Sequence, residues 1–526
     1  NDGGAPLKPT ALLLLTAASA AYVYVQAVYF VHMLQLNSYR PERYAAWRRE
    51  NRDRLLSPLR LAAPLLLLLF AGLTPLMGGW AAIAAVIPLG LFALLNVPPR
   101  AKKPLVFTHR VMRLFGTLAL LFAIAAAAAW LLPLWAAPAV YGAFSFPVFW
   151  WVALANRING PLERALANRY VRDARRRLEN SPRLTVIGIT GSYGKTSAKN
   201  FLHALLSVKY NVLMTPESYN TTMGVVRTIR EQLRPSHQIF IAEMGAKNPG
   251  DIREICDLVR PRYGMITSIG EQHLETFGTV ENIIRTKFEL ADALPPEGRA
   301  FLNYDNLHIR GRIVKNVPTV TYGVEGDAGA MYTASDIAVD AGGSRFTVTA
   351  PGGESRVFTT RLLGVHNIQN LVGCIAVAHT LGLTLEELVY PVRMLKPVPH
   401  RLQLLPNGYI DDAYNSNPAG FRAALDVLSR FEGQRVLVTP GMVELGQRQA
   451  ELNRELGAYA APRCDYVVLV GEKQAPPLLE GLTAAGFAAQ RIFVAKTLQE
   501  GLNWVNGLPF DRLRTVLLEN DLPDNF

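Results

Sequence analysis

Cysteine is scarce in this chain of 526 residues, and acidic side chains are nearly missing from its first third. The three cysteines lie far apart without metal-ligand spacing, so we expect reduced cytosolic thiols rather than a metal site: Cys256, Cys374 and Cys464. Residues 1–180 contain 7 Asp and Glu against 20 Lys and Arg, a net charge of +13, whereas the remainder contains 35 against 34. Because that remainder is close to neutral, we expect no nucleic-acid partner.

Long apolar runs fill the first third of the sequence. They cover about 11–36, 59–76, 79–97, 112–133 and 137–155, and most show no polar face. Each is close to the roughly 20 residues that a helix needs to cross a bilayer. We therefore predict an all-α transmembrane domain with about five spans; buried helices of a soluble protein are the alternative.

The basic residues between these runs predict their orientation. Six arginines separate the first two runs. Arg100, Lys102 and Lys103 lie between the third and the fourth, and Arg164, Arg169, Arg172 and Arg175 to Arg177 follow the fifth. The two remaining connections carry no Lys or Arg. Because basic loops stay on the cytoplasmic side, we expect an outside N-terminus and a cytoplasmic location for everything after residue 156.

The segment that follows the apolar third has the pattern of a nucleotide-binding loop. An apolar, β-rich run precedes GSYGKTS (191–197), and a run with helical spacing follows it. Gly191 and Gly194 would let backbone N–H groups approach phosphates. Lys195 would neutralise phosphate charge, and Thr196 would offer a hydroxyl to Mg²⁺. One glycine of the strict P-loop pattern is missing, so an ordinary strand–helix turn is the alternative.

Two later segments supply groups that such a loop needs. The strand-like run IFIAE ends in Glu243, and a second strand leads to His273 and to a helix that carries Lys287. Either His273 or Lys287 alone is more typical of a structural or solvated residue.

Eight segments of the sequence, in order along about 184–446, match the motifs of one enzyme family. They are GITGSYGKTS, EMGAKNPGDI, IGEQHLETFGT, RTKFE, LNYDN, GVHNIQN, DDAYNSNP and GMVELG. Together they resemble the Mur ligase family of ATP-dependent, amide-bond-forming enzymes of peptidoglycan precursor synthesis.

The resemblance implies roles for matched residues, and is strongest to the branch that adds D-alanyl-D-alanine to a UDP-MurNAc-tripeptide. Lys195 and Thr196 would hold the γ-phosphate and one Mg²⁺, which Glu243 would also ligate. His273 would hold a second Mg²⁺, and Lys287 matches a lysine that family members carbamylate, which gives an oxygen ligand. The residues implied to contact ATP are Gly191, Ser192, Gly194, Lys195, Thr196, Ser197, Asn303, His366, Asn367, Asn370, Arg401 and Asp412.

The resemblance also implies a multi-domain fold and a mechanism. A transmembrane domain with a basic cytoplasmic helix (1–180) would precede a central α/β P-loop domain (181–398) and a Rossmann-like α/β C-terminal domain (399–526). ATP would phosphorylate an acceptor carboxylate, and an amine would attack the acyl phosphate, releasing ADP and phosphate. Closure of the C-terminal domain would complete the site.

The sequence departs from the family pattern in the segments that bind the substrates. The usual soluble domain that grips UDP is absent, and the apolar runs stand in its place. The chain ends in acidic TVLLENDLPDNF where the branch often has a Lys-Gly-Ser-type segment, and Asn248 and Asn453 stand where His is often found. We therefore expect a multi-pass protein of the bacterial cytoplasmic membrane that takes a lipid-linked or membrane-proximal glycopeptide and an amino acid or dipeptide. The alternative is that the spans only anchor the enzyme.

Two other functions remain open. A poly-γ-glutamate-type ligase also pairs membrane association with this core, but DDAYNSNP and ELG favour the peptide ligase. A P-loop ATPase that drives transport through the spans predicts polar or acidic residues within them, and the sequence has almost none. Transport also predicts ATP hydrolysis without an acceptor or an amine.

Overall fold

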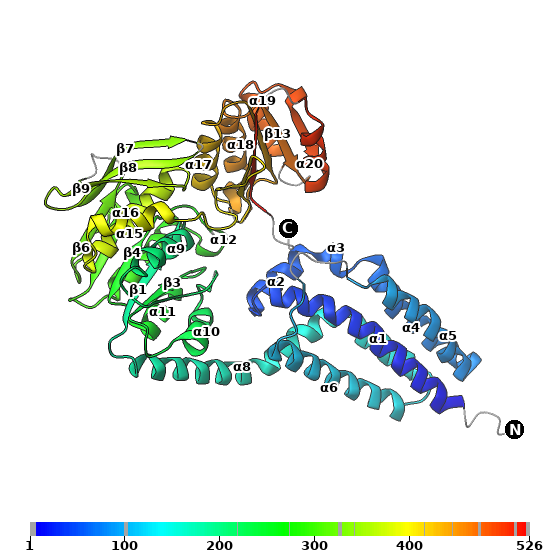
Figure 1. Cartoon of the computed structure of the whole chain (residues 1–526). Helices are drawn as coiled ribbons and strands as arrows, with labels where there is room; N and C mark the ends of the chain where they lie inside the picture. The colour runs from blue at the N-terminus through cyan, green and yellow to red at the C-terminus, as the bar shows by residue number, and fades with distance from the viewer. Residues whose placement is uncertain are drawn as a thin grey trace. The chain divides into compact units, whose positions relative to one another are not determined.

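The computed structural model describes residues 7–98, 104–217, 219–272, 274–324, 329–340, 342–414, 416–443, 445–471, 475–509 and 513–521 (Figure 1). They divide into two compact units, one that reaches Asn168 and one that begins at Arg169. The first unit is helical, and the second contains two β-sheets with their covering helices.

The helical unit is made of eight described helices, the last of which continues into the second unit. They are α1 (Leu7–Leu36), α2 (Pro41–Glu50), α3 (Arg52–Leu55), α4 (Pro58–Met77), α5 (Gly79–Leu95), α6 (His109–Leu131), α7 (Ala136–Ser145) and α8 (Val148–Glu179). Among the described residues, three segments are long and apolar enough to cross a membrane: Lys8–Leu36, Arg52–Met77 and His109–Leu131. The bent pair α7–α8 makes a fourth if it counts as one span, and α5 has only 17 residues. By length and composition, three to four candidate spans thus replace the predicted five.

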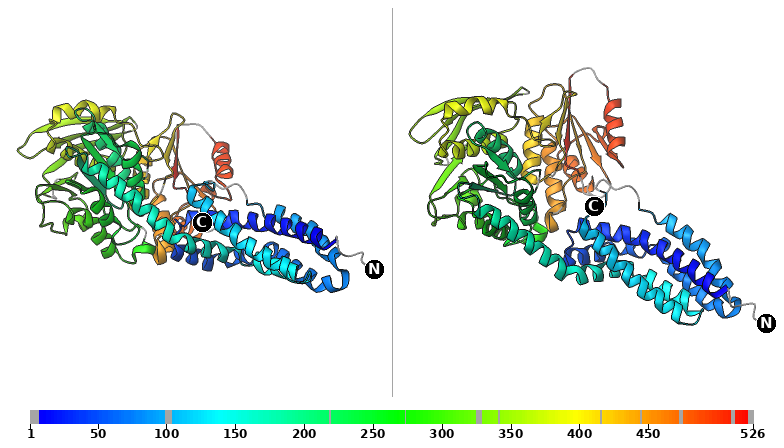
Figure 2. Two further views of the ribbon diagram at one scale, coloured as in Figure 1. Left: turned by 90° about the horizontal axis from the view of Figure 1, so that it is seen from below. Right: turned by 60° about the horizontal axis from the view of Figure 1, so that its bottom comes forward.

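Pro147 explains the bend of 70° between α7 and α8. Proline has no N–H with which to continue α7. Its carbonyl oxygen instead accepts the first bonds of α8, from Trp150 N at 2.8 Å and Trp151 N at 3.1 Å. From there α8 runs for 32 residues through Pro161, so the basic cytoplasmic helix predicted before residue 180 is the end of this longer helix. Figure 2 shows this helix as one continuous length.

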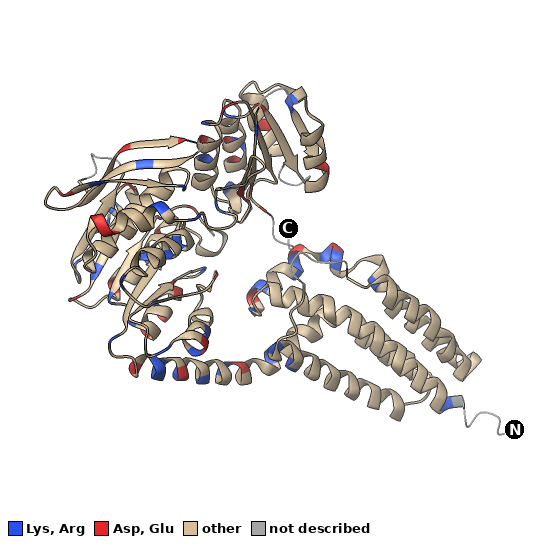
Figure 3. Ribbon diagram, viewed as in Figure 1, with Lys and Arg blue, Asp and Glu red and all other residues tan. Residues whose placement is uncertain are grey.

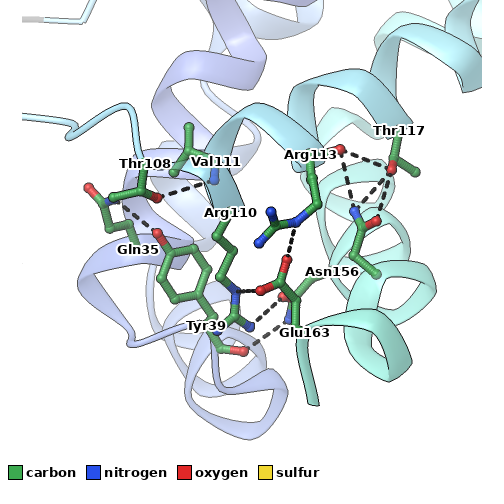
Figure 4. A network of polar contacts seen from close by, with 10 residues as sticks. Gln35, Tyr39, Thr108, Arg110, Val111, Arg113, Thr117, Asn156 and Glu163 are labelled. Atoms are coloured by element: carbon green, nitrogen blue, oxygen red, sulfur yellow. Dashed lines mark hydrogen bonds and ion pairs between the residues drawn. The ribbon is translucent and has the colours of Figure 1, made fainter. Parts of the chain in front are cut away.

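A polar network joins the start of α6 to α8 and to the corner between α1 and α2 (Figure 4). Arg113 Nε donates to Glu163 Oε1 at 2.6 Å, and the Arg110 guanidinium lies 4.0 Å from the centre of the Tyr39 ring. Asn156 is buried and donates its Nδ2 to the Tyr39 carbonyl oxygen at 3.0 Å. These directional bonds fix the register of helices whose other contacts are apolar and non-directional.

Charge is distributed unevenly over the helical unit. Basic residues lie on α2, on α3, at the start of α6 and along α8, whereas most of the length of α1, α4, α5 and α6 has none (Figure 3). This is the pattern from which the sequence predicts which helix ends face the cytoplasm.

The second unit contains a nine-stranded sheet with the order β2-β3-β1-β4-β5-β6-β7-β8-β9. Its strands are β1 (Thr185–Thr190), β2 (Val212–Met214), β3 (Ile239–Glu243), β4 (Tyr263–Ile266), β5 (Arg299–Asn303), β6 (Thr319–Gly323), β7 (Tyr332–Asp340), β8 (Gly343–Thr349) and β9 (Ser355–Thr360). The pairs from β2 to β7 are parallel, and β7, β8 and β9 pair antiparallel. The accompanying helices are α9 (Lys195–Leu206), α10 (Thr222–Gln232), α11 (Asp251–Val259), α12 (Leu274–Phe277), α13 (Val280–Asp292), α14 (Leu307–Arg310), α15 (Val365–Thr380) and α16 (Leu385–Met394).

β1 is buried on both faces because helices cover both sides of this sheet. Ile187 and Ile189 belong to a core with α9, α15 and α16, whereas Val186 belongs to another with α10, α11 and α13. Alternation of side chains along a strand produces this division. The carboxyl end of β1, from which the glycine loop leaves, is therefore fixed from both sides.

The end of α8 packs on this second core. Ala174 is part of it, and Val171 and Leu178 pack against it. Asp173 also accepts a hydrogen bond from Arg230 Nε of α10 at 2.7 Å. The division between the units therefore falls inside α8, after Asn168, whereas we predicted a domain border at residue 180.

A separate six-stranded sheet, with the order β10-β11-β15-β12-β13-β14, completes the second unit. Its strands are β10 (Gln403–Leu404), β11 (Tyr409–Asp412), β12 (Gln434–Thr439), β13 (Tyr466–Val470), β14 (Ile492–Ala495) and β15 (Arg514–Glu519). The helices of this part are α17 (Pro418–Leu428), α18 (Gln449–Ala460), α19 (Ala475–Ala484) and α20 (Leu498–Gly507). The two α/β sheets predicted after the helical region are confirmed, and the change of sheet falls near the predicted border at 398–399.

Candidate nucleotide and metal site

The glycine loop connects the carboxyl end of β1 to the start of α9. At Gly191, with φ of 153°, an added Cβ would lie 2.1 Å from Thr267 Oγ1. At Gly194, with φ of 79°, it would lie 2.6 Å from Asn370 Oδ1. Neither position accepts a side chain, and such close backbone approach is what a phosphate loop requires. The predicted contact residue Asn370 therefore buttresses the loop.

Lys195 begins α9 and folds back over the loop. Its Nζ donates to the Gly191 carbonyl oxygen at 2.7 Å and to the Ser192 carbonyl oxygen at 3.1 Å. Burial lowers the pKa of Lys195 to about 8; the Glu243 carboxylate opposes this shift, and the Arg401 guanidinium adds to it. Lys195, Glu243 and Arg401, all predicted from the sequence, are thus close enough to interact electrostatically.

Glu243 ends β3 and is fully buried beside the loop. Its Oε1 accepts hydrogen bonds from Thr196 Oγ1 at 3.1 Å and from Asn220 Nδ2 at 3.0 Å. Its Oε2 lies 3.0 Å from Lys199 Nζ. Thr196 and Glu243, both predicted to ligate Mg²⁺, are therefore hydrogen-bonded to each other. Two partners that the sequence did not indicate, Asn220 and Lys199, complete the surroundings of Glu243.

The donors at this point fit Mg²⁺. A hydroxyl and a carboxylate are hard oxygen ligands, and Mg²⁺ usually takes one or two protein ligands together with phosphates and water. Among the described residues, no group of three or more His, Cys, Asp or Glu side chains forms a metal site. Thr196 and Glu243 would therefore hold the ion together with the nucleotide.

Lys287 lies on α13 and is almost completely buried. Burial holds the pKa of its amine well below the usual range, and the charge of Lys195 lowers it further, whereas Asp251 and Glu289 oppose the shift. A lowered pKa enlarges the neutral fraction of the amine, which is the form that reacts with carbon dioxide. The predicted metal ligand His273 lies outside the described residues.

Two of the asparagines predicted to contact the rest of ATP donate hydrogen bonds to backbone carbonyl oxygens. Asn303 Nδ2 donates to the Thr267 carbonyl oxygen at 2.7 Å, and Asn367 Nδ2 donates to the Leu363 carbonyl oxygen at 2.8 Å. His366 is held neutral because burial lowers its pKa to about 4. Its buried Nδ1 has no hydrogen-bond partner among the described residues, so it remains available to a ligand. The contacts of these side chains with ATP stay predictions.

The six-stranded sheet contributes a pair of neighbouring carboxyl groups, of which that of Glu519 is fully buried. Asp412 ends β11 directly opposite Glu519 at the end of β15. Burial raises the pKa of Asp412 to about 6, and burial together with Asp412 raises the pKa of Glu519 well above its usual range. Ser416 Oγ donates to Glu519 Oε1 at 2.6 Å. Glu519 was not predicted, because a strand-end carboxylate near the chain end gives no signal by itself.

A contact between the two sheet-bearing parts lies next to the loop. Arg448, which follows β12, forms an ion pair with Glu271, which follows β4. The two asparagines at positions where the resemblance implies histidine have bonds to nearby groups: Asn453 exchanges hydrogen bonds with the backbone of Met442, and Asn248 N donates to Asp251.

Comparisons with known proteins agree with this fold and geometry. The chain matches the Mur ligase middle domain over residues 189–378 and the Mur ligase, glutamate ligase domain over residues 400–508. A crystal structure of MurF from Acinetobacter baumannii is similar with a TM-score of 0.61 and 30% identity, covering 67% of this chain and 76% of that one. MurF from Thermotoga maritima in complex with ADP has a TM-score of 0.60 and 27% identity, with 67% and 80% covered.

The chain belongs to the Mur ligase family, and its two sheets are the middle and C-terminal domains of that family. Within the family it is similar to MurF ligases. The UDP-N-acetylmuramoyl-tripeptide–D-alanyl-D-alanine ligase of Escherichia coli K12 is 34% identical over 294 residues, 55% of this chain. The chain spans 65% of the length of that relative. Both family matches begin after the helical unit.

Proposed function

We propose that this chain is an ATP-dependent, ADP-forming ligase that joins an acceptor carboxylate to the amine of an amino acid or dipeptide. The observation that carries the proposal is the meeting of Lys195, Thr196 and Glu243 at the carboxyl ends of β1 and β3 within a Mur ligase fold. Ligands of open α/β sheets bind at this edge.

Different residues of the loop have different roles in phosphoryl transfer. Backbone N–H groups at Gly191 and Gly194 hold phosphate oxygens, and the Lys195 ammonium balances charge on the γ-phosphoryl group. Mg²⁺, when bound, neutralises phosphate charge next to Thr196 and Glu243. The acceptor carboxylate takes the γ-phosphoryl group from ATP. The amine then attacks the carbonyl carbon of the acyl phosphate, and inorganic phosphate leaves.

We further propose that Lys287 acts as a carbamate. Its amine is buried and has a lowered pKa, which favours the neutral form that can attack carbon dioxide, and loss of a proton then leaves an anionic oxygen pair. This converts a side chain that repels cations into one that supports a second Mg²⁺ with His273. The low pKa of the amine is the property of this chain that supports the modification.

For the substrates we propose a muramoyl peptide acceptor and a D-alanyl-D-alanine-like donor, as named for the Escherichia coli relative. The helical unit would insert into the cytoplasmic membrane with its N-terminus outside, and the acceptor would be lipid-linked or held close to the membrane. Three long apolar helices and the basic ends of α2, α3 and α6 support this placement.

Substrate-dependent ATP turnover by the full chain in detergent tests the proposal. ADP release should require an acceptor carboxylate and an amine together, and a lipid-linked muramoyl peptide should be used better than its soluble UDP-linked counterpart. Hydrolysis of ATP with neither substrate present would favour a transport ATPase. Successive addition of glutamate to one acceptor would favour a poly-γ-glutamate-type ligase.

A further inference from the structure

Lys199 is a second lysine at the nucleotide site, one helical turn after Lys195 on α9. Its side chain is 1% exposed, as is that of Glu243, and the two charged groups lie 3.0 Å apart. Lys199 Nζ also donates to the Glu217 carbonyl oxygen in the loop between β2 and α10. An amine buried this deeply is stable only when its charge is balanced, and Glu243 supplies that balance.

The two oxygens of Glu243 have different surroundings. Oε1 accepts from the uncharged Thr196 and Asn220, whereas Oε2 is next to the Lys199 charge. Because Thr196 also begins α9, Oε1 is the oxygen that lies next to the phosphate loop. Oε2 accepts no hydrogen bond from the described residues, so its contact with Lys199 is an ion pair only. The carboxylate thus has neutral hydrogen-bond donors at one oxygen and a positive charge at the other.

A purely structural role explains these contacts poorly. The Glu217 carbonyl needs one hydrogen-bond donor, which a neutral side chain provides at lower desolvation cost. A buried ion pair adds little stability over an apolar pair of similar size, because removing both charges from water is costly. The charge on Lys199 is explained by what it does to Glu243.

We propose that Lys199 is a positioning residue that directs Glu243 toward the magnesium ion. By attracting Oε2 electrostatically, it leaves Oε1 and the Thr196 hydroxyl as the pair that meets the cation. It also offsets the carboxylate charge, so that the protein does not depend on Mg²⁺ to keep Glu243 buried. This inference rests on the metal site in the proposed function and assigns to that site a residue without a direct contact to the ion.

Substituting Lys199→Gln separates charge from hydrogen bonding, because glutamine can still donate to the Glu217 carbonyl. The measurement is the melting temperature of the full chain in detergent with ADP, titrated with Mg²⁺. Without Mg²⁺ the variant should melt lower than the wild type, since Glu243 loses its buried ion-pair partner. Its rise on adding Mg²⁺ should be larger, with half-saturation at about a tenfold lower concentration, since a competing cation is gone.

Turnover should change in the opposite sense. Loss of the fixed carboxylate orientation should lower kcat about 10- to 100-fold with little change in the KM for ATP. Lys199→Arg, which keeps the charge, should restore the wild-type response to Mg²⁺. Lys209→Gln is the matched control, because Lys209 is exposed, donates to the Gly382 carbonyl oxygen and lies over the ring of Tyr210.

Glu243→Gln distinguishes failure of this inference from failure of the proposed metal site. If Glu243→Gln abolishes the Mg²⁺ response and Lys199→Gln responds like the wild type, Lys199 has only a structural role. If Glu243→Gln leaves the response intact, the ion does not bind at Glu243, and the proposed site and this inference both fall. A response to Mg²⁺ in Lys199→Gln larger than that of Lys209→Gln supports the positioning role.

Discussion

At the scale of single residues, Lys195 has the surroundings of a phosphate ligand. It is tied to the loop carbonyls, and burial lowers its pKa to about 8. Lys195→Ala should lower ligation about 100- to 1000-fold, the usual cost of removing one preorganised donor to a transition state. ADP release with both substrates present measures this, and Lys209→Ala is the control. A rate near that of the wild type would remove the P-loop assignment.

The lowered pKa of Lys195 also predicts how nucleotide affinity depends on pH. Phosphate oxygens favour the ammonium form, and the free protein loses that proton as the pH rises through about 8. ADP should therefore bind progressively more weakly between about pH 7 and about pH 9. The unfolded chain keeps the proton up to the ordinary pKa of 10.5, so this group alone raises stability over the same rise in pH. Calorimetric titration of ADP at several pH values checks the binding; an affinity independent of pH contradicts it.

Lys287 gives a prediction by chemical rescue. Lys287→Ala removes the amine that would form the carbamate, so turnover should fall strongly. Short carboxylic acids such as acetate can occupy the freed space and return an oxygen pair, so they should restore part of the rate. Lys315→Ala, at an exposed position, should show no rescue. Unimpaired turnover of Lys287→Ala would make Lys287 a buried structural residue.

The sequence identified the residues that carry a motif and missed those brought in by tertiary packing. Lys195 and Thr196 follow from a glycine loop, and Glu243 follows from a strand that ends in a carboxylate. Asn220 and Lys199 reach Glu243 only because β2 and β3 are neighbours in the sheet and α9 covers them. No local pattern encodes that adjacency.

At the scale of elements, β11 and β15 bring Asp412 and Glu519 face to face. Because the folded protein binds the Glu519 proton more tightly than the unfolded chain does, this group costs stability as the pH rises above its ordinary pKa of 4.5. Glu519→Gln cannot ionise and can donate to Asp412, so it should stabilise the protein by about 1 kcal/mol near neutral pH. The gain in melting temperature should shrink toward about pH 5. A gain that does not vary with pH would show that Glu519 is not a buried acid.

Element types were easier to predict than element ends. The apolar runs predicted helices in the first third, but an apolar run cannot show where a helix bends. Pro147 ends α7, whereas Pro161 is carried within α8 without a break. The difference depends on what replaces the missing hydrogen bond and on what the helix packs against. Whether the helix continues through Pro161 therefore could not be predicted without the tertiary structure.

At the scale of the whole molecule, α8 belongs to both units, and this decides where the chain can be divided. Val171, Ala174 and Leu178 pack on the core of the middle domain, and Asp173 pairs with Arg230. A protein that begins at Arg169 keeps these contacts, whereas one that begins at Ser181 loses them. We expect the shorter protein to melt lower, since each partly buried apolar side chain contributes on the order of 1 kcal/mol.

The protein that begins at Arg169 also shows what the helical unit contributes. Its nucleotide site lies entirely in the retained part, so ADP should bind as it does to the full chain. If the helical unit holds the acceptor, the truncated protein should lose use of a lipid-linked muramoyl peptide, with a rise in KM larger than the fall in kcat. Equal KM values for the two proteins would mean that the helices only anchor the enzyme. The comparison separates these cases. Removing an anchor lowers the local concentration of the enzyme at a membrane but has no such effect in detergent. Removing a binding surface lowers the affinity for the acceptor in both conditions.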